Sequence, residues 1–195
     1  MELMRIDRKL QFVIPVEDDE GKVFAYVHSA PIGRETFERY FLVLSKAFTA
    51  IYTQGLGTTV GPRCAALLVK QIATEAGEWE GAHGVERGLF AEIDRLTNVA
   101  MAGPKGWQVI PLEEALASGA FTEDDASEVK NAIVFFIVAS AIHKKQELRG
   151  ILESVVKLWN AQTTSLNVTE FVSSLKTSTP DEPTGAKETP SSIPC

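Results

Sequence analysis

The apolar run from Ala132 to Ile142 constrains the fold of this chain more than any other feature. It contains eleven residues, and Ser140 is the only polar one. A helix that crosses a membrane needs about 20 apolar residues, so this run is too short to span a bilayer. Thr122 and three acidic residues precede it, and Lys144 and Lys145 follow it, as the helix dipole favours. We therefore predict a long, buried helix from about 123 to 144.

A helix that is apolar on all sides must be covered all round. Two interpretations of the segment 132–139 remain open at this point. It lies at the centre of a helical bundle, or part of its surface is covered by a partner. Phe136 continues a stripe that faces the core, whereas its neighbours point elsewhere on the helix. The candidate partner-binding residues are therefore Val134, Phe135, Ile137 and Val138.

Further helices are predicted from apolar residues that recur every three or four positions. One such stripe is formed by Phe37, Phe41, Leu44, Phe48 and Ile51, and its helix should end at Gly55-Leu56-Gly57. A second helix should begin at Pro62, because proline is favoured in the first turn, and run towards Gly77. The remaining helices are expected at 86–96, 112–118, 148–159 and after Asn167.

The first residues predict two strands, at 9–16 and 23–28, joined by an acidic turn at 17–22. Pro15 lacks an N–H, so it should lie on an exposed edge or near a strand end. Residues 97–111 are expected to be irregular, apart from a short strand at 107–110. The fold class is therefore mainly α (α+β), with six to seven helices and an N-terminal β-hairpin. The expected organisation is a hairpin at 1–32, a helical domain at 33–176 and a disordered tail at 177–195.

Composition excludes several classes of function. The formal net charge is −7 and the basic residues are scattered, so nucleic acid is not an expected partner. No segment has the order of a signal peptide or the length of a membrane span. The two cysteines, Cys64 and Cys195, do not form a disulfide framework, and a reducing cytoplasm is the expected location.

A search for catalytic, cofactor-binding and metal-binding patterns yields no site. Gly55, Gly57 and Gly61 have the wrong spacing for a phosphate loop and follow a helix rather than a strand. The three histidines stand apart from other metal-ligand residue types. The acidic clusters at 17–20 and 123–125 are typical of a solvated turn and a helix start. We therefore expect a protein that is not an enzyme and needs no cofactor.

Several phrases of the sequence resemble the tail assembly chaperones of long-tailed bacteriophages. They are YVHSAPI at 26–32, AIYTQGLG at 50–57, LWNAQTTSLNVTEF at 158–171 and SLKTST at 174–179. The resemblance covers about residues 9–180. It rests on short sequence segments that are specific to the family and do not indicate a particular chemistry.

The resemblance implies a viral protein made in the host cytoplasm and absent from the finished virion. Such chaperones bind the tape-measure protein, keep that long helix soluble and help to recruit tail-tube protein. In many phages a frameshift appends a second domain, and a polar tail from Lys176 would suit such a junction. Self-association through the apolar helix is a further expectation. The family has no catalytic residues to carry over.

Two other classes of function stay open. The chain could be a structural virion component, such as a connector or a tail-completion protein, or an enzyme of unrecognised type. Tail-tube subunits are rich in β-structure, so one hairpin and a short strand argue against a tube subunit. Mass spectrometry of purified virions separates the structural class from the chaperone.

Overall fold

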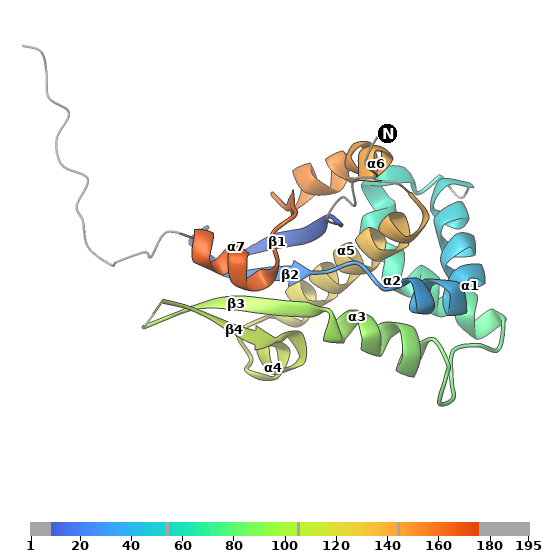
Figure 1. The fold of residues 1–195 in the computed structure, drawn as a ribbon, viewed down its shortest axis with the longest axis horizontal. Helices are drawn as coiled ribbons and strands as arrows, with labels where there is room; N and C mark the ends of the chain where they lie inside the picture. The colour runs from blue at the N-terminus through green and yellow to red at the C-terminus, as the bar shows by residue number, and fades with distance from the viewer. Residues whose placement is uncertain (1–8, 54, 105, 144, 176–195) are drawn as a thin grey trace, which may run out of the picture.

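A five-stranded antiparallel sheet and a layer of helices make up the fold (Figure 1). The computed structural model describes residues 9–53, 55–104, 106–143 and 145–175. The strands are β1 (Gln11–Glu17), β2 (Val23–Ser29), β3 (Thr97–Gly103), β4 (Gly106–Pro111) and β5 (Gln162–Thr164). Their order across the sheet is β4-β3-β2-β1-β5. The predicted N-terminal hairpin is confirmed, and strands from later in the chain extend it on both sides.

The segment 97–111 is a second hairpin, which corrects the expectation of an irregular connection. β3 pairs with β2 on one side and with β4 on the other. Its sequence, TNVAMAG, is poor in the residues that favour strands, so the pairing partners impose the conformation. Pro15 lies inside β1 rather than at its end. β5 pairs only with 11–13, so at Pro15 the sheet has no strand on that side of β1 among the described residues.

The described helices are seven α-helices and one π-helical turn, in agreement with the predicted α+β class. Their bounds are α1 (Arg34–Thr53), α2 (Gly57–Glu75), η1 (Glu86–Phe90), α3 (Ala91–Arg95), α4 (Leu112–Ala117), α5 (Glu123–Ile142), α6 (Lys145–Leu158) and α7 (Val168–Ser174). Capping boxes begin two of them: Thr122 pairs with Asp125 at α5, and Asn167 pairs with Glu170 at α7. The predicted long helix is thus confirmed to within two residues.

Two helix predictions need correction. α2 begins at Gly57, five residues before the predicted start at Pro62, which therefore stands inside the helix. Pro62 is the sixth residue of α2, beyond the first turn, so the helix lacks the backbone hydrogen bond that an N–H at this position would donate. In α1 the buried face contains Tyr40, Val43 and Ala47, beside Leu44 and Ile51. Of the predicted stripe, Phe37 and Phe48 are only partly buried and Phe41 is exposed, because the helix faces its neighbours along a rotated stripe.

The sheet is covered on both faces. On one face Phe12 of β1 stacks on Phe136 of α5, with ring centroids 5.2 Å apart. Beyond α5 lie α1, α2 and α6, all of which contact it. On the other face, Phe171 of α7 packs edge-on against Tyr26, 5.4 Å away, and against His28 (Figure 1). α5 is therefore central to the molecule.

Strands from 1–32 and from 33–176 form one sheet over one hydrophobic core. The N-terminal hairpin is stabilised by this shared sheet, because a two-stranded hairpin alone is only marginally stable in water. The predicted tail at 177–195 lies outside the described residues. None of the described helices combines the length and apolar character needed to span a membrane.

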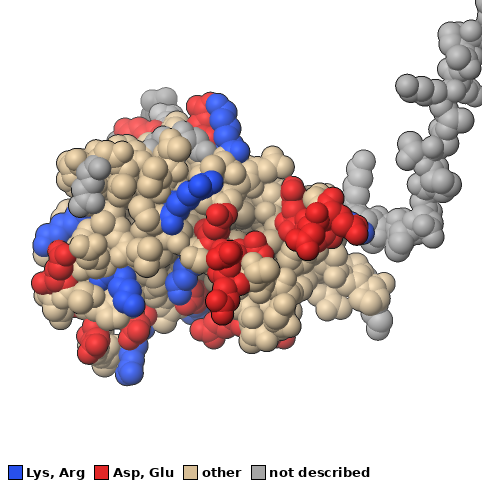
Figure 2. All heavy atoms as spheres, turned by 180° about the vertical axis from the view of Figure 1, so that it is seen from behind, with Lys and Arg blue, Asp and Glu red and all other residues tan. Residues whose placement is uncertain are grey.

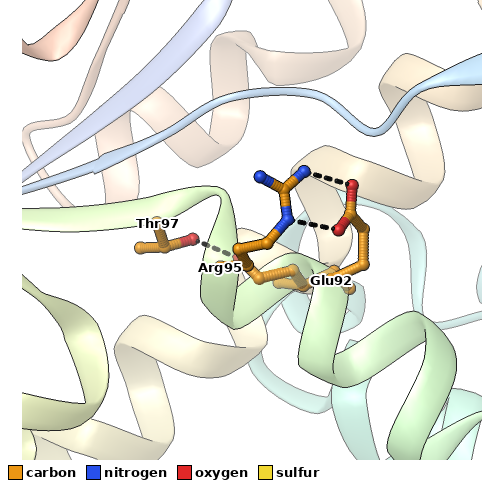
Figure 3. A network of polar contacts seen from close by, with 4 residues as sticks. Glu92, Arg95 and Thr97 are labelled. Atoms are coloured by element: carbon orange, nitrogen blue, oxygen red, sulfur yellow. Dashed lines mark hydrogen bonds and ion pairs between the residues drawn. The ribbon is translucent and has the colours of Figure 1, made fainter.

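A polar junction joins α3 to the sheet. The Arg95 guanidinium donates two hydrogen bonds to the Glu92 carboxylate, at 2.7 and 2.8 Å (Figure 3). The buried Thr97 hydroxyl donates to the carbonyl oxygen of Ile93, at 2.8 Å, and lies 3.1 Å from the Ser29 hydroxyl. The Thr97 contacts link the end of α3 to β3 and β2, whereas the Glu92–Arg95 ion pair lies within α3 and is largely exposed.

Candidate functional site

The four candidate partner-binding residues of the sequence lie inside the protein. Val134, Phe135, Ile137 and Val138 are each at most 1 % exposed. The chain itself covers them, through the sheet on one side and the neighbouring helices on the other. They occupy the bundle centre, the first of the two interpretations, and a partner cannot reach them in the folded chain. We therefore look for a binding surface elsewhere.

The three histidines and Cys64 lie in separate places in the part of the chain that the structure describes. The described residues contain no group of three metal-ligand side chains. His28 is buried on the α7 face, with Nε2 3.1 Å from the carbonyl oxygen of Leu166, and burial lowers its pKa. His83 is exposed, and His143 lies at the end of α5 beside Glu147. Burial raises the pKa of the Cys64 thiol, which weakens it as a nucleophile.

The acidic clusters have structural roles. Acidic side chains gather at the β1–β2 turn and over the start of α5, as Figure 2 shows. In the turn, the Asp18 carboxylate accepts hydrogen bonds from the backbone N–H groups of Glu20 and Lys22. At α5 the acids complement the positive end of the helix dipole. Gly55 and Gly57 adopt positive φ where α1 connects to α2. This backbone conformation favours glycine, so the two glycines are explained by the turn and need no role in phosphate binding.

An exposed apolar ridge runs along α2. Val60, Cys64 and Leu67 follow one another at helical spacing, and Val60 and Leu67 are 48 % and 66 % exposed. The exposed side chains of Arg63 and Lys70 flank the ridge on the same helix, so its apolar surface is bordered by positive charge. Leu67 is the most exposed large apolar side chain among the described residues. We call Val60, Cys64 and Leu67 the α2 ridge.

Beside Leu67 the surface opens into a cavity of about 340 Å³, which we call the α2 pocket. α2, α5 and the segment from Trp79 to Asp94 enclose it. Trp79 and Phe90 form its aromatic wall, with their rings edge to face at 5.4 Å. Trp79 stands in a loop held by two backbone bonds, from Val85 to Glu78 and from Glu86 to Trp79, so the wall is built in place.

Charged groups surround this aromatic wall. The Lys70 ammonium lies over the Trp79 ring at 5.3 Å, and the Lys130 ammonium lies over the Phe90 ring at 5.2 Å. Among the described residues neither ammonium has a hydrogen-bond acceptor, and the Asp94 carboxylate has no hydrogen-bond donor. Burial raises the pKa of Asp94, while the nearby charge of Lys130 opposes that rise. The pocket thus presents two ammonium groups, the Asp94 and Glu86 carboxylates and the Ser127 hydroxyl around an apolar wall.

Asn131 holds the two helices of the pocket together. Its side-chain oxygen accepts the backbone N–H of Ala66 in α2, at 2.9 Å, and its amide donates to the carbonyl oxygen of Ser127, also at 2.9 Å. Only 5 % of Asn131 is exposed, so this pairing satisfies a polar group that would otherwise be costly to bury. The position of α2 relative to α5 is therefore set by a specific contact as well as by packing.

Sequence reasoning missed the ridge and the pocket. Leu67 belongs to an apolar run and shows no sign of being exposed, and the pocket residues come from three separate segments. One signal was available: Asn131 is a lone amide at the start of the apolar run of α5. A buried polar side chain at such a position needs a partner from another element.

No family model, curated protein or solved structure matches this chain in the three comparisons. The α2 ridge and the α2 pocket are therefore the candidate binding surface of the described residues. It presents an exposed apolar side chain next to a preformed cavity that has an aromatic wall and a few polar groups.

Proposed function

We propose that this protein is a phage tail assembly chaperone that binds the tape-measure protein through the α2 ridge and the α2 pocket. The observation that carries the proposal is Leu67, 66 % exposed at the rim of an aromatic cavity. An apolar anchor beside a preformed pocket is a common arrangement at protein-binding surfaces. A chaperone for an aggregation-prone helix needs such a surface, because it must cover apolar side chains of its client.

The phrases at 26–32, 50–57 and 158–171 support the choice of client, through their resemblance to this family. In this proposal the protein acts without a catalytic step, without a cofactor and in the host cytoplasm. It holds the tape-measure protein soluble and brings tail-tube protein to it. Nucleic acid and membranes are not among its proposed partners.

Co-expression with the tape-measure protein of the same phage tests the proposal. We expect the wild-type chain to keep the tape-measure protein soluble and to co-purify with it. Leu67→Asp should abolish or strongly reduce both effects, because a charge at the apolar anchor must be desolvated on binding. The matched control is Leu42→Asp, since Leu42 is also a leucine on a helix and is 62 % exposed.

Retention of full client binding by Leu67→Asp would remove the α2 ridge from the proposal. Loss of binding in both variants would point to a general effect of added charge. Failure of the wild-type chain to bind the tape-measure protein would overturn the chaperone function itself.

The alternative is a structural virion component, such as a connector or a tail-completion protein. Quantitative mass spectrometry of purified virions separates the two functions. A chaperone should be abundant in infected cells and absent from virions, whereas a connector should be present in a fixed copy number.

A further inference from the structure

We infer that the α2 pocket receives one large apolar side chain of a protein segment, together with the peptide group of that same residue. The inference rests on the proposed function, because it specifies what part of a client the pocket holds. Three features of the pocket carry it: its size, the chemistry of its wall and the hydrogen-bonding groups around it.

Size limits the occupant to a small group. At about 340 Å³ the pocket lies at the lower end of the range for ligand sites, which runs from about 300 to about 1,000 Å³. Trp79, Phe90 and Leu67 supply apolar contact for the occupant. A single aromatic or large aliphatic side chain suits such a space, and the edge-to-face geometry of Trp79 and Phe90 leaves ring surface for a third group.

The polar groups select the chemistry next to that side chain. Lys70 and Lys130 have N–H donors without acceptors among the described residues, and Asp94 has an acceptor without a donor. A peptide group carries the complementary pair, a carbonyl oxygen for an ammonium and an N–H for the carboxylate. A cationic occupant gains nothing over a neutral one, because both ammonium groups already lie over the aromatic rings and the charges of Lys70 and Lys130 balance those of Glu86 and Asp94.

Small model compounds test this inference on the full chain without a client. The probe is N-acetyltryptophanamide, which has an indole ring and peptide groups but no charge. N-acetylalaninamide lacks the large side chain, 3-methylindole lacks the peptide groups, and tryptamine carries a positive charge. Binding is followed by the ¹⁵N-indole resonance of Trp79, which is assigned by its loss in Trp79→Phe.

We expect N-acetyltryptophanamide to bind at least about ten-fold more tightly than each of the other three compounds. Asp94→Asn and Lys130→Gln should each weaken its binding and leave that of 3-methylindole unchanged. Ala66→Leu, which places a larger side chain at the pocket wall, should weaken both. Leu42→Asp should change neither. Circular dichroism melts show whether each variant retains its fold.

Equal binding of N-acetyltryptophanamide and 3-methylindole would overturn the role of the peptide group, and tighter binding of tryptamine would overturn the whole assignment. These outcomes are separate from the chaperone test. If the protein solubilises the tape-measure protein but does not bind the probe, the proposed function stands and the assignment of the α2 pocket is wrong. If the protein binds the probe but not the tape-measure protein, the assignment of the α2 pocket stands and the chaperone function is wrong.

Discussion

His28 is one of two histidines with a partly or fully buried ring, and it sits at the contact between the sheet and α7. Its ring packs against Phe171, and its Nε2 lies within hydrogen-bond distance of the carbonyl oxygen of Leu166. Burial lowers the pKa of His28, and the backbone hydrogen bonds only partly oppose that effect. The folded protein therefore favours the neutral imidazole of His28 more strongly than water does.

This arrangement predicts that stability falls with acidification. Because the folded pKa lies below the ordinary histidine value of about 6.5, the unfolded chain binds more protons between the two values. The contribution of neutral His28 is fully present above about pH 6.5 and is lost progressively as the pH falls below it. Urea unfolding at several pH values measures the slope. His28→Gln retains a hydrogen-bond donor without titrating, so its slope over this interval should be smaller.

Phe135 tests the burial of α5. It has no exposed surface, so Phe135→Asp would place an unpaired charge in the core at a cost of several kcal/mol. We expect the variant to lose its cooperative thermal transition or to be insoluble, whereas Leu42→Asp should melt within a few degrees of wild type. A Phe135→Asp variant with a native-like thermal transition would show that residue 135 of α5 can reach solvent in the folded protein.

At the scale of elements, α1 and α2 approach each other closely at Gly61. Gly61 of α2 faces Ile51 of α1, which is fully buried. A Cβ atom added at Gly61 would lie 2.6 Å from the Ile51 Cγ2 atom. Glycine is therefore retained here for its small size, although it lowers the helix propensity of α2.

Gly61→Ala should consequently destabilise the protein by up to about 2 kcal/mol, because an overpacking cost of about 1–3 kcal/mol outweighs the gain in helix propensity of up to about 1 kcal/mol. Adding Ile51→Leu removes the Cγ2 branch at nearly constant volume, and the double variant should recover part of the loss. Chemical denaturation of the wild type, the two single variants and the double variant gives the coupling energy between positions 51 and 61. A Gly61→Ala variant that is more stable than wild type would show that the two helices can move apart freely.

At the scale of the whole molecule, the sequence predicts features set by neighbouring residues better than features set by contacts between distant segments. The helix starts at Thr122 and Asn167 follow from a capping residue and its neighbours, so the sequence alone reveals them. β3 could not be predicted, because Asn98, Ala100 and Ala102 favour a strand only once β2 and β4 flank them. The pocket depends on the same kind of information, since Leu67, Phe90 and Lys130 meet only in the folded chain.

The pairing of β5 with β1 has a consequence for synthesis on the ribosome. Gln11 and Thr164 are paired although about 150 residues separate them along the chain. The β1–β2 hairpin must therefore wait until β5 has been synthesised before β1 gains its second neighbour, and until α7 follows before Phe171 covers Tyr26. Helix pairs such as α1 and α2 can form while translation continues. Closure of the sheet therefore comes late relative to the formation of these helices, and a nascent chain that stalls after α6 still carries an open edge along β1.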